Sequence, residues 1–325
     1  MIALPGVRHI LPRDQRRWLA LLLVVFLSLL HSGCSPVMNR FISRMMERIN
    51  APIEPVKNKI AHPLRPNVGL SVLWIGHATV LIQIHDKVFI TDPAFTKTVG
   101  MLARRSVEPG LDPSAITRLD YTLISHIHLD HFSYGSLDLL PKGGKLLIPV
   151  GAAGYTPEFG FAETREMKPW EVLEKDGVRI TAVPVQHFGG RYGFDISWSP
   201  NRGYTGYVIE YKGVTVFFAG DTGYHPELFK EIGRRFRIDL ALLPIAPVEP
   251  REFMQRVHAD PKEAVQIFED VGARIMIPMH YKPFNQGLEP GPAYAQELLE
   301  RVIEGKGYRD RIQILDIGEQ LVLIP

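Results

Sequence analysis

The chain has 325 residues, of which 46% are hydrophobic and 22% charged, and its formal net charge is +2. This composition places it in the soluble globular class, with enough apolar material for a buried core. The first 33 residues carry four Arg against one Asp, so the remaining residues have a formal charge of −1. The main part of the chain therefore lacks the excess of positive charge that would indicate nucleic-acid binding. The single cysteine, Cys34, excludes an internal disulfide and leaves no thiolate for a metal site within the folded domain.

The N-terminal segment contains a 13-residue apolar run, Trp18 to Leu30, that directly follows two Arg residues. A membrane span needs about 20 residues, so this run fits the apolar core of a signal peptide better. A Ser-Gly pair before Cys34 resembles a bacterial lipoprotein processing site, although His31 stands where Leu is usual. We therefore expect residues 1–33 to be a signal peptide or membrane-targeting segment and Cys34 to be lipidated. The chain would then lie in the bacterial cell envelope, lipid-anchored and facing the periplasm; an uncleaved anchor or a free thiol are the alternatives.

Residues 34–66 are predicted to form an amphipathic helix followed by a Pro-rich linker. Apolar residues recur at three- and four-residue spacing from Val37 to Ile49, while Arg40 and Arg44 fall on the other side. Such a helix either lies on a membrane surface or packs its apolar face on the main domain. Four prolines between residues 51 and 66 disfavour regular structure. The main domain is therefore predicted over residues 67–325.

The main domain alternates β-rich apolar runs with helical patterns and shows no internal repeat. Residue 260 is an Asp, followed by Pro261 and by Glu263, which together predict a capped helix start. This mix favours an α/β fold in which two sheets lie between helices. The predicted strands are 70–75, 80–84, 88–91, 121–124, 178–185, 214–220, 274–279, 312–317 and 320–324, and the predicted helices are 134–140, 261–268 and 292–304.

The run His126-Ile127-His128-Leu129-Asp130-His131 follows the buried strand predicted at 121–124. Neutral imidazole and carboxylate both suit Zn²⁺, and ligands at alternate positions of an extended turn can serve two ions. A polar surface loop that happens to be rich in His is the alternative. The spacing therefore predicts a site for two metal ions.

Further ligand candidates follow other predicted strands: His187 after 178–185, Asp221 after 214–220 and His280 after 274–279. In α/β folds such strand ends usually gather at one edge of the sheet, where sites are built. Each of these residues alone could equally be a hydrogen-bonded structural residue. Together with the His-rich run they predict one metal centre.

The order of these residues resembles the metallo-β-lactamase superfamily over about residues 70 to 285. Runs outside the metal motif, 74–79, 91–93, 219–224, 247–251 and 258–261, resemble its N-acylphosphatidylethanolamine-hydrolysing phospholipase D branch. The resemblance implies the metallo-β-lactamase αββα sandwich. It also implies that His126, His128 and His187 hold one zinc, that Asp130, His131 and His280 hold the other, and that Asp221 bridges them.

Two cations lower the pKa of a shared water enough to supply a bridging hydroxide near neutral pH. Asp130 has a second expected role in orienting that hydroxide or shuttling its proton. His258 would contact the phosphate or protonate the leaving group, and it could equally be structural. Asp92 and His77 are candidates to support a ligand, and His77 could equally have a purely structural role as a hydrogen-bonded residue of a turn. Zinc is the expected metal, and the sequence leaves iron and manganese open.

The expected function is hydrolysis of N-acylphosphatidylethanolamine or a related membrane phospholipid by a zinc phosphodiesterase. The alternatives are a lactonase or esterase acting on a small soluble ester, and a non-catalytic envelope scaffold. Phe188, Tyr192 and Trp198 would suit a lipid, or simply pack in the core and its rim. Arg191 and Arg251 would suit a phosphate, or lie on the surface.

Overall fold

A computed structural model describes residues 39, 40, 43, 44, 47, 49, 51–57, 59–100, 103–199, 202–284 and 286–325. The chain divides into two compact units, Met1–Met46 and Glu47–Pro325. The expected signal peptide, Cys34 and most apolar positions of the predicted amphipathic helix lie outside the described residues. Residues 39, 40, 43 and 44 of the first unit are helical. Within the described ranges, every helix is too short or too polar to cross a membrane.

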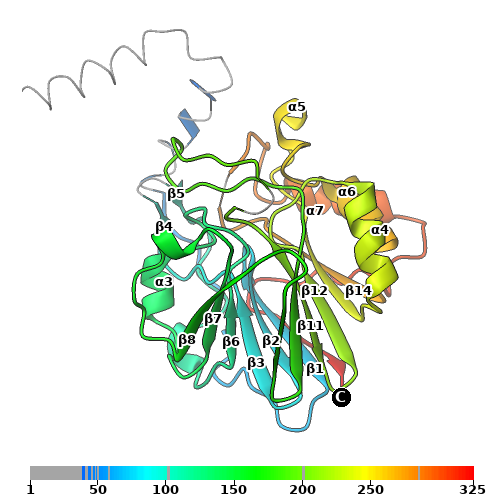
Figure 1. Ribbon diagram of the computed structural model, residues 1–325. Coiled ribbons are helices and arrows are strands. Elements are labelled where there is room, and N and C mark those ends of the chain that lie inside the picture. Colours follow the sequence, from blue (N-terminus) through cyan, green and yellow to red (C-terminus); the bar gives the residue numbers. More distant parts are fainter. Residues whose placement is uncertain are drawn as a thin grey trace, which may run out of the picture. The chain divides into compact units, whose positions relative to one another are not determined.

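The second unit contains two large sheets (Figure 1). The first has seven strands in the order β15-β1-β2-β3-β6-β7-β8, and the second has six in the order β14-β13-β12-β11-β10-β9. The first sheet comprises β1 (Leu70–Gly76), β2 (Thr79–Ile84), β3 (Lys87–Thr91), β6 (Tyr121–Leu123), β7 (Lys145–Pro149), β8 (Glu163–Met167) and β15 (Gln320–Ile324). The second comprises β9 (Val172–Lys175), β10 (Val178–Val183), β11 (Gly206–Tyr211), β12 (Val214–Phe218), β13 (Leu240–Pro244) and β14 (Ile275–Met279).

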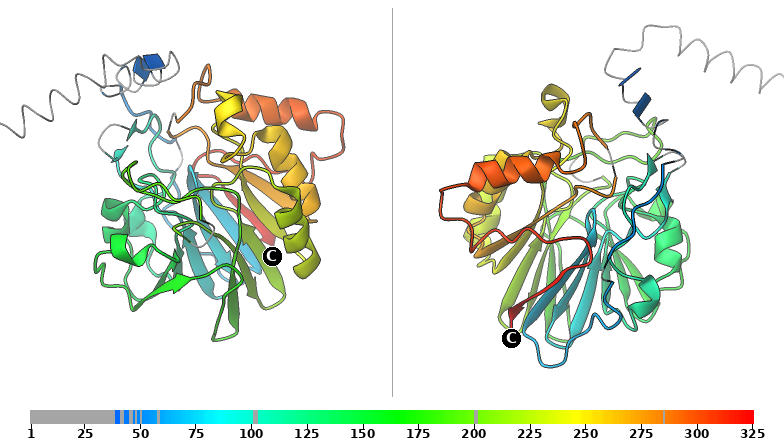
Figure 2. Two further views of the ribbon diagram at one scale, coloured as in Figure 1. Left: turned by 45° about the horizontal axis from the view of Figure 1, so that its top comes forward. Right: turned by 180° about the vertical axis from the view of Figure 1, so that it is seen from behind.

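Helices cover the outer face of each sheet, as the views in Figures 1 and 2 show. α3 (Tyr134–Asp138) lies beside the first sheet, and α4 (Pro226–Arg235), α6 (Pro261–Asp270) and α7 (Tyr294–Ile303) lie beside the second. The remaining elements are the short pair β4 (Thr98–Val99) and β5 (Ala103–Arg104), α5 (Arg251–Met254), and the 3-10 turns Pro113–Ala115 and Ala153–Tyr155.

The alternation of side chains along β1 explains this layering, because successive residues of a strand point to opposite faces. Val72 and Trp74 belong to the large apolar cluster that contains Phe217 of the second sheet. Leu73 belongs to a second cluster, together with Leu137 of α3. All seven residues of β1 are buried. A sheet that is apolar on both faces needs a layer on each side, so the predicted αββα sandwich is confirmed.

Most predicted elements of the main domain are present, with one clear exception. The strand predicted at 312–317 is wrong: Ile312 makes an isolated bridge to Met276, and residues 313–318 form no strand. The Pro-rich stretch belongs to the second unit and hydrogen bonds to other residues of that unit. Glu54 N donates to Ser106 O at 2.8 Å, and Arg65 N donates to Gln83 Oε1 at 2.8 Å.

Candidate metal centre

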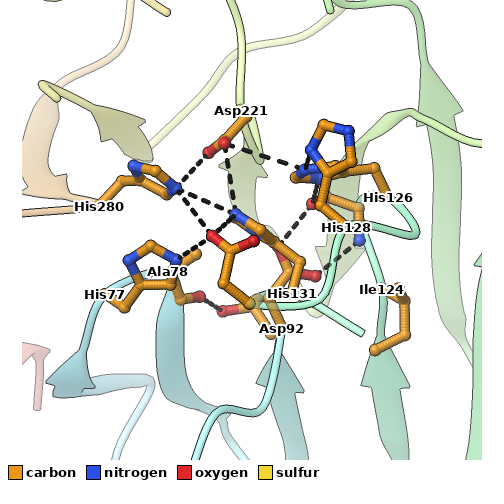
Figure 3. A network of polar contacts seen from close by, with 12 residues as sticks. His77, Ala78, Asp92, Ile124, His126, His128, His131, Asp221 and His280 are labelled. Carbon is orange, nitrogen blue, oxygen red and sulfur yellow. Dashed lines mark hydrogen bonds and ion pairs between the residues drawn. The ribbon is translucent and has the colours of Figure 1, made fainter. Parts of the chain in front are cut away.

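Loops from both sheets meet at one edge of the sandwich and form the candidate metal centre (Figure 3). The strands that lead into it run in the same direction within each sheet, so their carboxyl ends lie at a common edge. The first sheet supplies His77 after β1, Asp92 after β3 and the run 126–131 after β6, and the second supplies His187 after β10, Asp221 after β12 and His280 after β14. All seven predicted ligands are thus brought together.

Three side chains reach the centre from backbone in the left-handed region, which is unusual for residues other than Gly. The φ angles are 57° for His77, 32° for Asp92 and 64° for His280. Such conformations cost about 1–3 kcal/mol each and persist where the surroundings hold them. Here the His77 carbonyl accepts hydrogen bonds from Trp74 Nε1 and from His280 N, both at 2.9 Å. The turns after β1 and β14 are therefore locked to each other.

Three imidazoles form the first donor cluster. His128 Nδ1 lies 2.8 Å from His126 Nε2 and 3.4 Å from His187 Nε2. Burial lowers the pKa of His126 and of His187 well below its ordinary value, and lowers the pKa of His128 to about 4. Neutral imidazole is the form that binds metal ions. The cluster is therefore suited to a cation at neutral pH.

The second donor cluster combines imidazoles with carboxylates. His131 Nε2 lies 3.0 Å from His280 Nε2 and 3.1 Å from Asp130 Oδ2. Burial opposes a charge on His131 and His280, but Asp221 and Asp130 outweigh it, raising the pKa of His131 well above its ordinary value and that of His280 to about 9. These carboxylates thus stabilise positive charge at this position. A metal ion can supply that charge in place of the protons on the imidazoles.

Asp221 faces both clusters. Its Oδ1 lies 3.0 Å from His280 Nε2, and its Oδ2 lies 3.3 Å from His131 Nε2 and 3.9 Å from His126 Nε2. Oδ1 is buried, and because its contact with His280 Nε2 lacks hydrogen-bond geometry, it has no hydrogen-bond partner among the described residues. A buried carboxylate oxygen in this situation is costly unless a cation compensates it. Imidazole nitrogens and carboxylate oxygens in this arrangement fit two divalent transition metals.

The second ring nitrogen of each of four candidate ligands is held by a hydrogen bond, which fixes the nitrogen that faces the centre. The contacts are His126 Nδ1 to Ser125 Oγ at 2.9 Å, His131 Nδ1 to Asp92 Oδ2 at 2.7 Å, His187 Nδ1 to Val257 O at 2.9 Å and His280 Nδ1 to Ala246 O at 2.9 Å. The prediction that Asp92 orients an imidazole is confirmed. Asp92 is itself held by Ser125 N at 2.7 Å.

Asp130 is held by two residues outside the predicted ligand set. His77 Nε2 lies 2.8 Å from Asp130 Oδ2, and Gln286 Nε2 donates to the same oxygen. Burial lowers the pKa of His77 to about 3, so its ring is neutral and can donate one hydrogen bond. His77 therefore contacts a predicted ligand, as the supporting role expected for it requires. Sequence reasoning missed Gln286, because a Gln in a loop has no distinguishing pattern.

His258 lies beside the centre, in the turn between α5 and α6. Its backbone N donates to Met254 O at 2.8 Å, and its Nδ1 lies 3.6 Å from Asp221 Oδ2. That Nδ1 is buried without a hydrogen-bond partner in the part of the chain described. Burial lowers the pKa of His258 to about 3. A neutral imidazole with an unused nitrogen is available to a bound molecule.

The two arginines considered for phosphate binding are committed to the protein's own loops. Arg191 Nη1 donates to Ile127 O and Phe132 O, both at 3.0 Å. Arg251 Nη1 donates to His258 O at 2.9 Å, and its Nη2 pairs with Glu263. Both guanidinium groups position loops of the centre through these contacts, and Arg191 Nε has no hydrogen-bond partner among the described residues.

The comparisons with known proteins agree with this geometry. Residues 88–281 match a family described as the beta-lactamase superfamily domain. The chain is 31% identical to N-acyl-phosphatidylethanolamine-hydrolyzing phospholipase D 1 of Caenorhabditis elegans, over 72% of this chain and 69% of that protein. It is 29% identical to the mitochondrial N-acyl-phosphatidylethanolamine-hydrolyzing phospholipase D of Saccharomyces cerevisiae, over 76% of this chain and 54% of the yeast protein.

Solved structures share the fold at lower identity. A possible metal-dependent hydrolase from Veillonella parvula superposes with a TM-score of 0.61 at 18% identity, over 79% of this chain and all of that one. An isothiocyanate hydrolase from Delia radicum gut bacteria superposes with a TM-score of 0.63 at 18% identity, over 78% and 100%. The fold, the His and Asp clusters and the family match lead to one conclusion: the chain belongs to the metallo-β-lactamase superfamily, within which it is a metal-dependent hydrolase.

Proposed function

We propose that the chain is a dinuclear zinc phosphodiesterase of the phospholipase D type that acts on N-acylphosphatidylethanolamine-like membrane lipids. The observation that carries the proposal is the identity of 31% and 29% to two relatives named for this reaction, over most of the chain. The buried His and Asp clusters described above supply the donors that such a site requires.

In the proposed site His126, His128 and His187 would hold one zinc, Asp130, His131 and His280 would hold the other, and Asp221 would contact both. When bound, two such cations supply a hydroxide near neutral pH and stabilise negative charge on the phosphate. Four of the five imidazoles have the opposite nitrogen fixed by Ser125, Asp92 or a backbone carbonyl. The protein therefore presents its donors already oriented.

Asp130 and His258 carry the remaining roles in the proposal. Asp130 Oδ2 is held by His77 and Gln286, which fixes the carboxylate for a proton transfer. The neutral His258 ring would donate a hydrogen bond to a phosphate oxygen or to the leaving oxygen. Attack of the hydroxide oxygen would form a new P–O bond and break the bond to the N-acylethanolamine oxygen. That oxygen would take up the proton transferred by Asp130, leaving phosphatidic acid.

The N-terminal sequence supports a location in the bacterial cell envelope. We propose that residues 1–33 direct export, that Cys34 carries lipid, and that the hydrolase faces the periplasm beside its substrate bilayer. A lipid anchor would raise the local concentration of the enzyme at the surface that contains the substrate.

The proposal is tested by incubating the zinc-loaded chain with vesicles that contain N-acylphosphatidylethanolamine and measuring phosphatidic acid release. We expect release by the wild type, and a loss of at least about a hundredfold in His128→Ala, because that imidazole lies in the first donor cluster. The matched control is His62→Ala, because His62 is exposed and distant in sequence from every predicted ligand.

Zinc content separates the possible outcomes. No phosphatidic acid release by a wild type that holds two zinc ions would refute the lipid activity. Hydrolysis of soluble esters or lactones by that preparation would then favour the alternative small-molecule hydrolase. Equal release by wild type and His128→Ala would show that the activity does not arise at this centre.

A further inference from the structure

Exposed hydrophobic side chains gather beside the metal centre. Of the seven large hydrophobic residues that are markedly exposed within the described ranges, five lie in residues 192–198 and on α5. They are Tyr192, Phe194, Ile196, Trp198 and Phe253, with exposed fractions of 55%, 88%, 51%, 52% and 70%. Single exposed apolar residues are ordinary, but here four fall within seven consecutive residues, and Phe253 lies three residues before Arg256, which contacts the Trp198 ring. We call residues 188–199 the aromatic loop.

The aromatic loop has a defined backbone, so the exposure of its side chains is a feature of the fold. Gly189 and Ser197 pair as an antiparallel bridge, with N to O distances of 2.7 and 2.8 Å. Asp195 accepts hydrogen bonds from the backbone N of Tyr192 at 2.8 Å and from Tyr155 Oη at 2.8 Å. The rings of Tyr192 and Phe194 stack with centroids 5.8 Å apart. The loop is therefore a hydrogen-bonded hairpin from which the rings of Tyr192, Phe194 and Trp198 are exposed to solvent.

A row of aromatic rings connects this surface to the candidate ligands. The Phe188 ring centroid lies 4.6 Å from that of His128 and 5.2 Å from that of Trp198. One ring, that of Phe188, therefore separates Trp198 from His128 of the first donor cluster. A molecule bound to the aromatic loop would lie beside the metal centre.

The charges around the aromatic loop favour an anionic partner. Its one carboxylate, Asp195, is used by the loop's own backbone and by Tyr155. Arg256 lies over the Trp198 ring at 5.0 Å, and both Arg256 and Arg202 are exposed and make no ion pair with the residues described here. Glu252 on α5 is the opposing exposed charge. These two available cations, one over the Trp198 ring and one with its backbone against Gly189 of the loop, match the headgroup region of a bilayer with acidic lipids.

We propose that the aromatic loop and Phe253 dock the hydrolase unit onto an anionic phospholipid bilayer. Phe194, Ile196 and Phe253 enter the boundary between headgroups and acyl chains, while Tyr192 and Trp198 remain at headgroup level. This inference deepens the proposed lipid activity and rests on it for its purpose. The docking itself is a binding event that can be measured without substrate or turnover.

The test is hydrogen exchange of the full-length Cys34→Ser chain, followed by peptide analysis, with phosphatidylcholine vesicles with and without phosphatidylglycerol. Neither vesicle contains N-acylphosphatidylethanolamine, so a failure of the proposed reaction leaves this measurement unaffected. We expect residues 189–199 to become protected by the vesicles that contain phosphatidylglycerol. Because exchange is read peptide by peptide, binding through the N-terminal segment is distinguished from binding through the loop.

Variants make the test specific. The double variant Phe194→Ser, Phe253→Ser removes two rings that are 88% and 70% exposed, so folding is retained. The lipid concentration at which the loop is half-protected should rise about tenfold or more. The matched control, Leu139→Ser, removes an apolar residue that is 52% exposed at the end of α3, and it should behave as the wild type.

Three results would overturn the proposal. The loop could remain unprotected at saturating lipid, or the double variant could match Leu139→Ser. Protection that appears without lipid and grows with protein concentration would instead assign the surface to contact between copies of this chain.

Discussion

Asp130 is the residue of the centre at which a substitution can best distinguish a chemical role from a structural one. Its Oδ2 is held by His77 Nε2 at 2.8 Å and by Gln286, and it lies 3.1 Å from His131 Nε2. Asp130→Asn keeps the volume and one oxygen for His77 but removes the charge. We expect turnover to fall by about a hundredfold or more while the chain stays folded, because a carboxylate that transfers protons contributes about 10²–10⁴ in rate.

The measurement is turnover of the vesicle substrate together with bound zinc and circular dichroism. Asp138→Asn is the matched control. Asp138 is exposed on α3, so this substitution makes the same chemical change away from the centre. Near-normal turnover in Asp130→Asn would remove this residue from the mechanism. Loss of one zinc together with turnover would assign it to metal binding alone.

For individual residues, the sequence predicts the candidate metal ligands better than the residues that hold those ligands in place. His126 and His187 could be proposed because ligand-type residues recur where β-rich runs end. Gln286 and Arg191 could not be assigned, because their roles depend on which loops meet in space. Arg191 holds the carbonyls of Ile127 and Phe132, a contact across about sixty residues that no local pattern contains.

The end of β12 shows how one element places a ligand. Gly220 has φ of 62°, and a Cβ added to it would clash with the Ser125 side chain. Ser125 in turn holds Asp92 and His126. Gly220→Ala should therefore lower the free energy of unfolding by about 3 kcal/mol, from backbone strain and overpacking together. It should also weaken zinc binding, because it displaces residues on either side of the centre.

The same strand offers a matched control. Gly213 precedes β12 with φ of 81°, and a Cβ there would meet nothing within 4 Å. Gly213→Ala should cost only the backbone strain, about 1–2 kcal/mol, and leave zinc affinity unchanged. Denaturant unfolding and zinc titration of both variants check the prediction. Equal effects of the two substitutions on zinc affinity would show that close packing against Ser125 does not place Asp221.

A strong local signal predicts some elements correctly, although the sequence analysis omits β13 and α4, and a strand that depends on its neighbours is predicted wrongly. α6 begins at Pro261 with the full capping box predicted from Asp260 and Glu263. The run 312–317 has the apolar composition of a strand, but beyond its bridge at Ile312 it has no pairing partner. Its side chains instead cover the core, where Ile312 and Leu315 are buried. Apolar composition reports burial, whereas strand formation also requires a partner.

At the scale of the whole hydrolase unit, the centre joins the two sheets of the sandwich. His126, His128 and His131 follow β6 of the first sheet, whereas His187, Asp221 and His280 follow strands of the second. Two imidazole pairs that face each other come from opposite sheets: His131 and His280 at 3.0 Å, and His128 and His187 at 3.4 Å. A cation bound between two such imidazole nitrogens would interact with both of them and so link the two sheets. We therefore expect bound metal to stabilise the packing of one sheet on the other.

Removing the metal should then lower the stability of the whole unit. At free zinc about a hundredfold above the dissociation constant, binding to the native state contributes about 3 kcal/mol, which corresponds to a Tm shift of several degrees. We expect EDTA to lower Tm by this amount and added zinc to restore it, as followed by calorimetry. His62→Ala should respond as the wild type, whereas His128→Ala should show a smaller shift, because it lacks a donor of the first cluster. A wild type that loses its zinc to EDTA at constant Tm would contradict a metal-stabilised contact between the sheets, since linkage requires stability to follow occupancy.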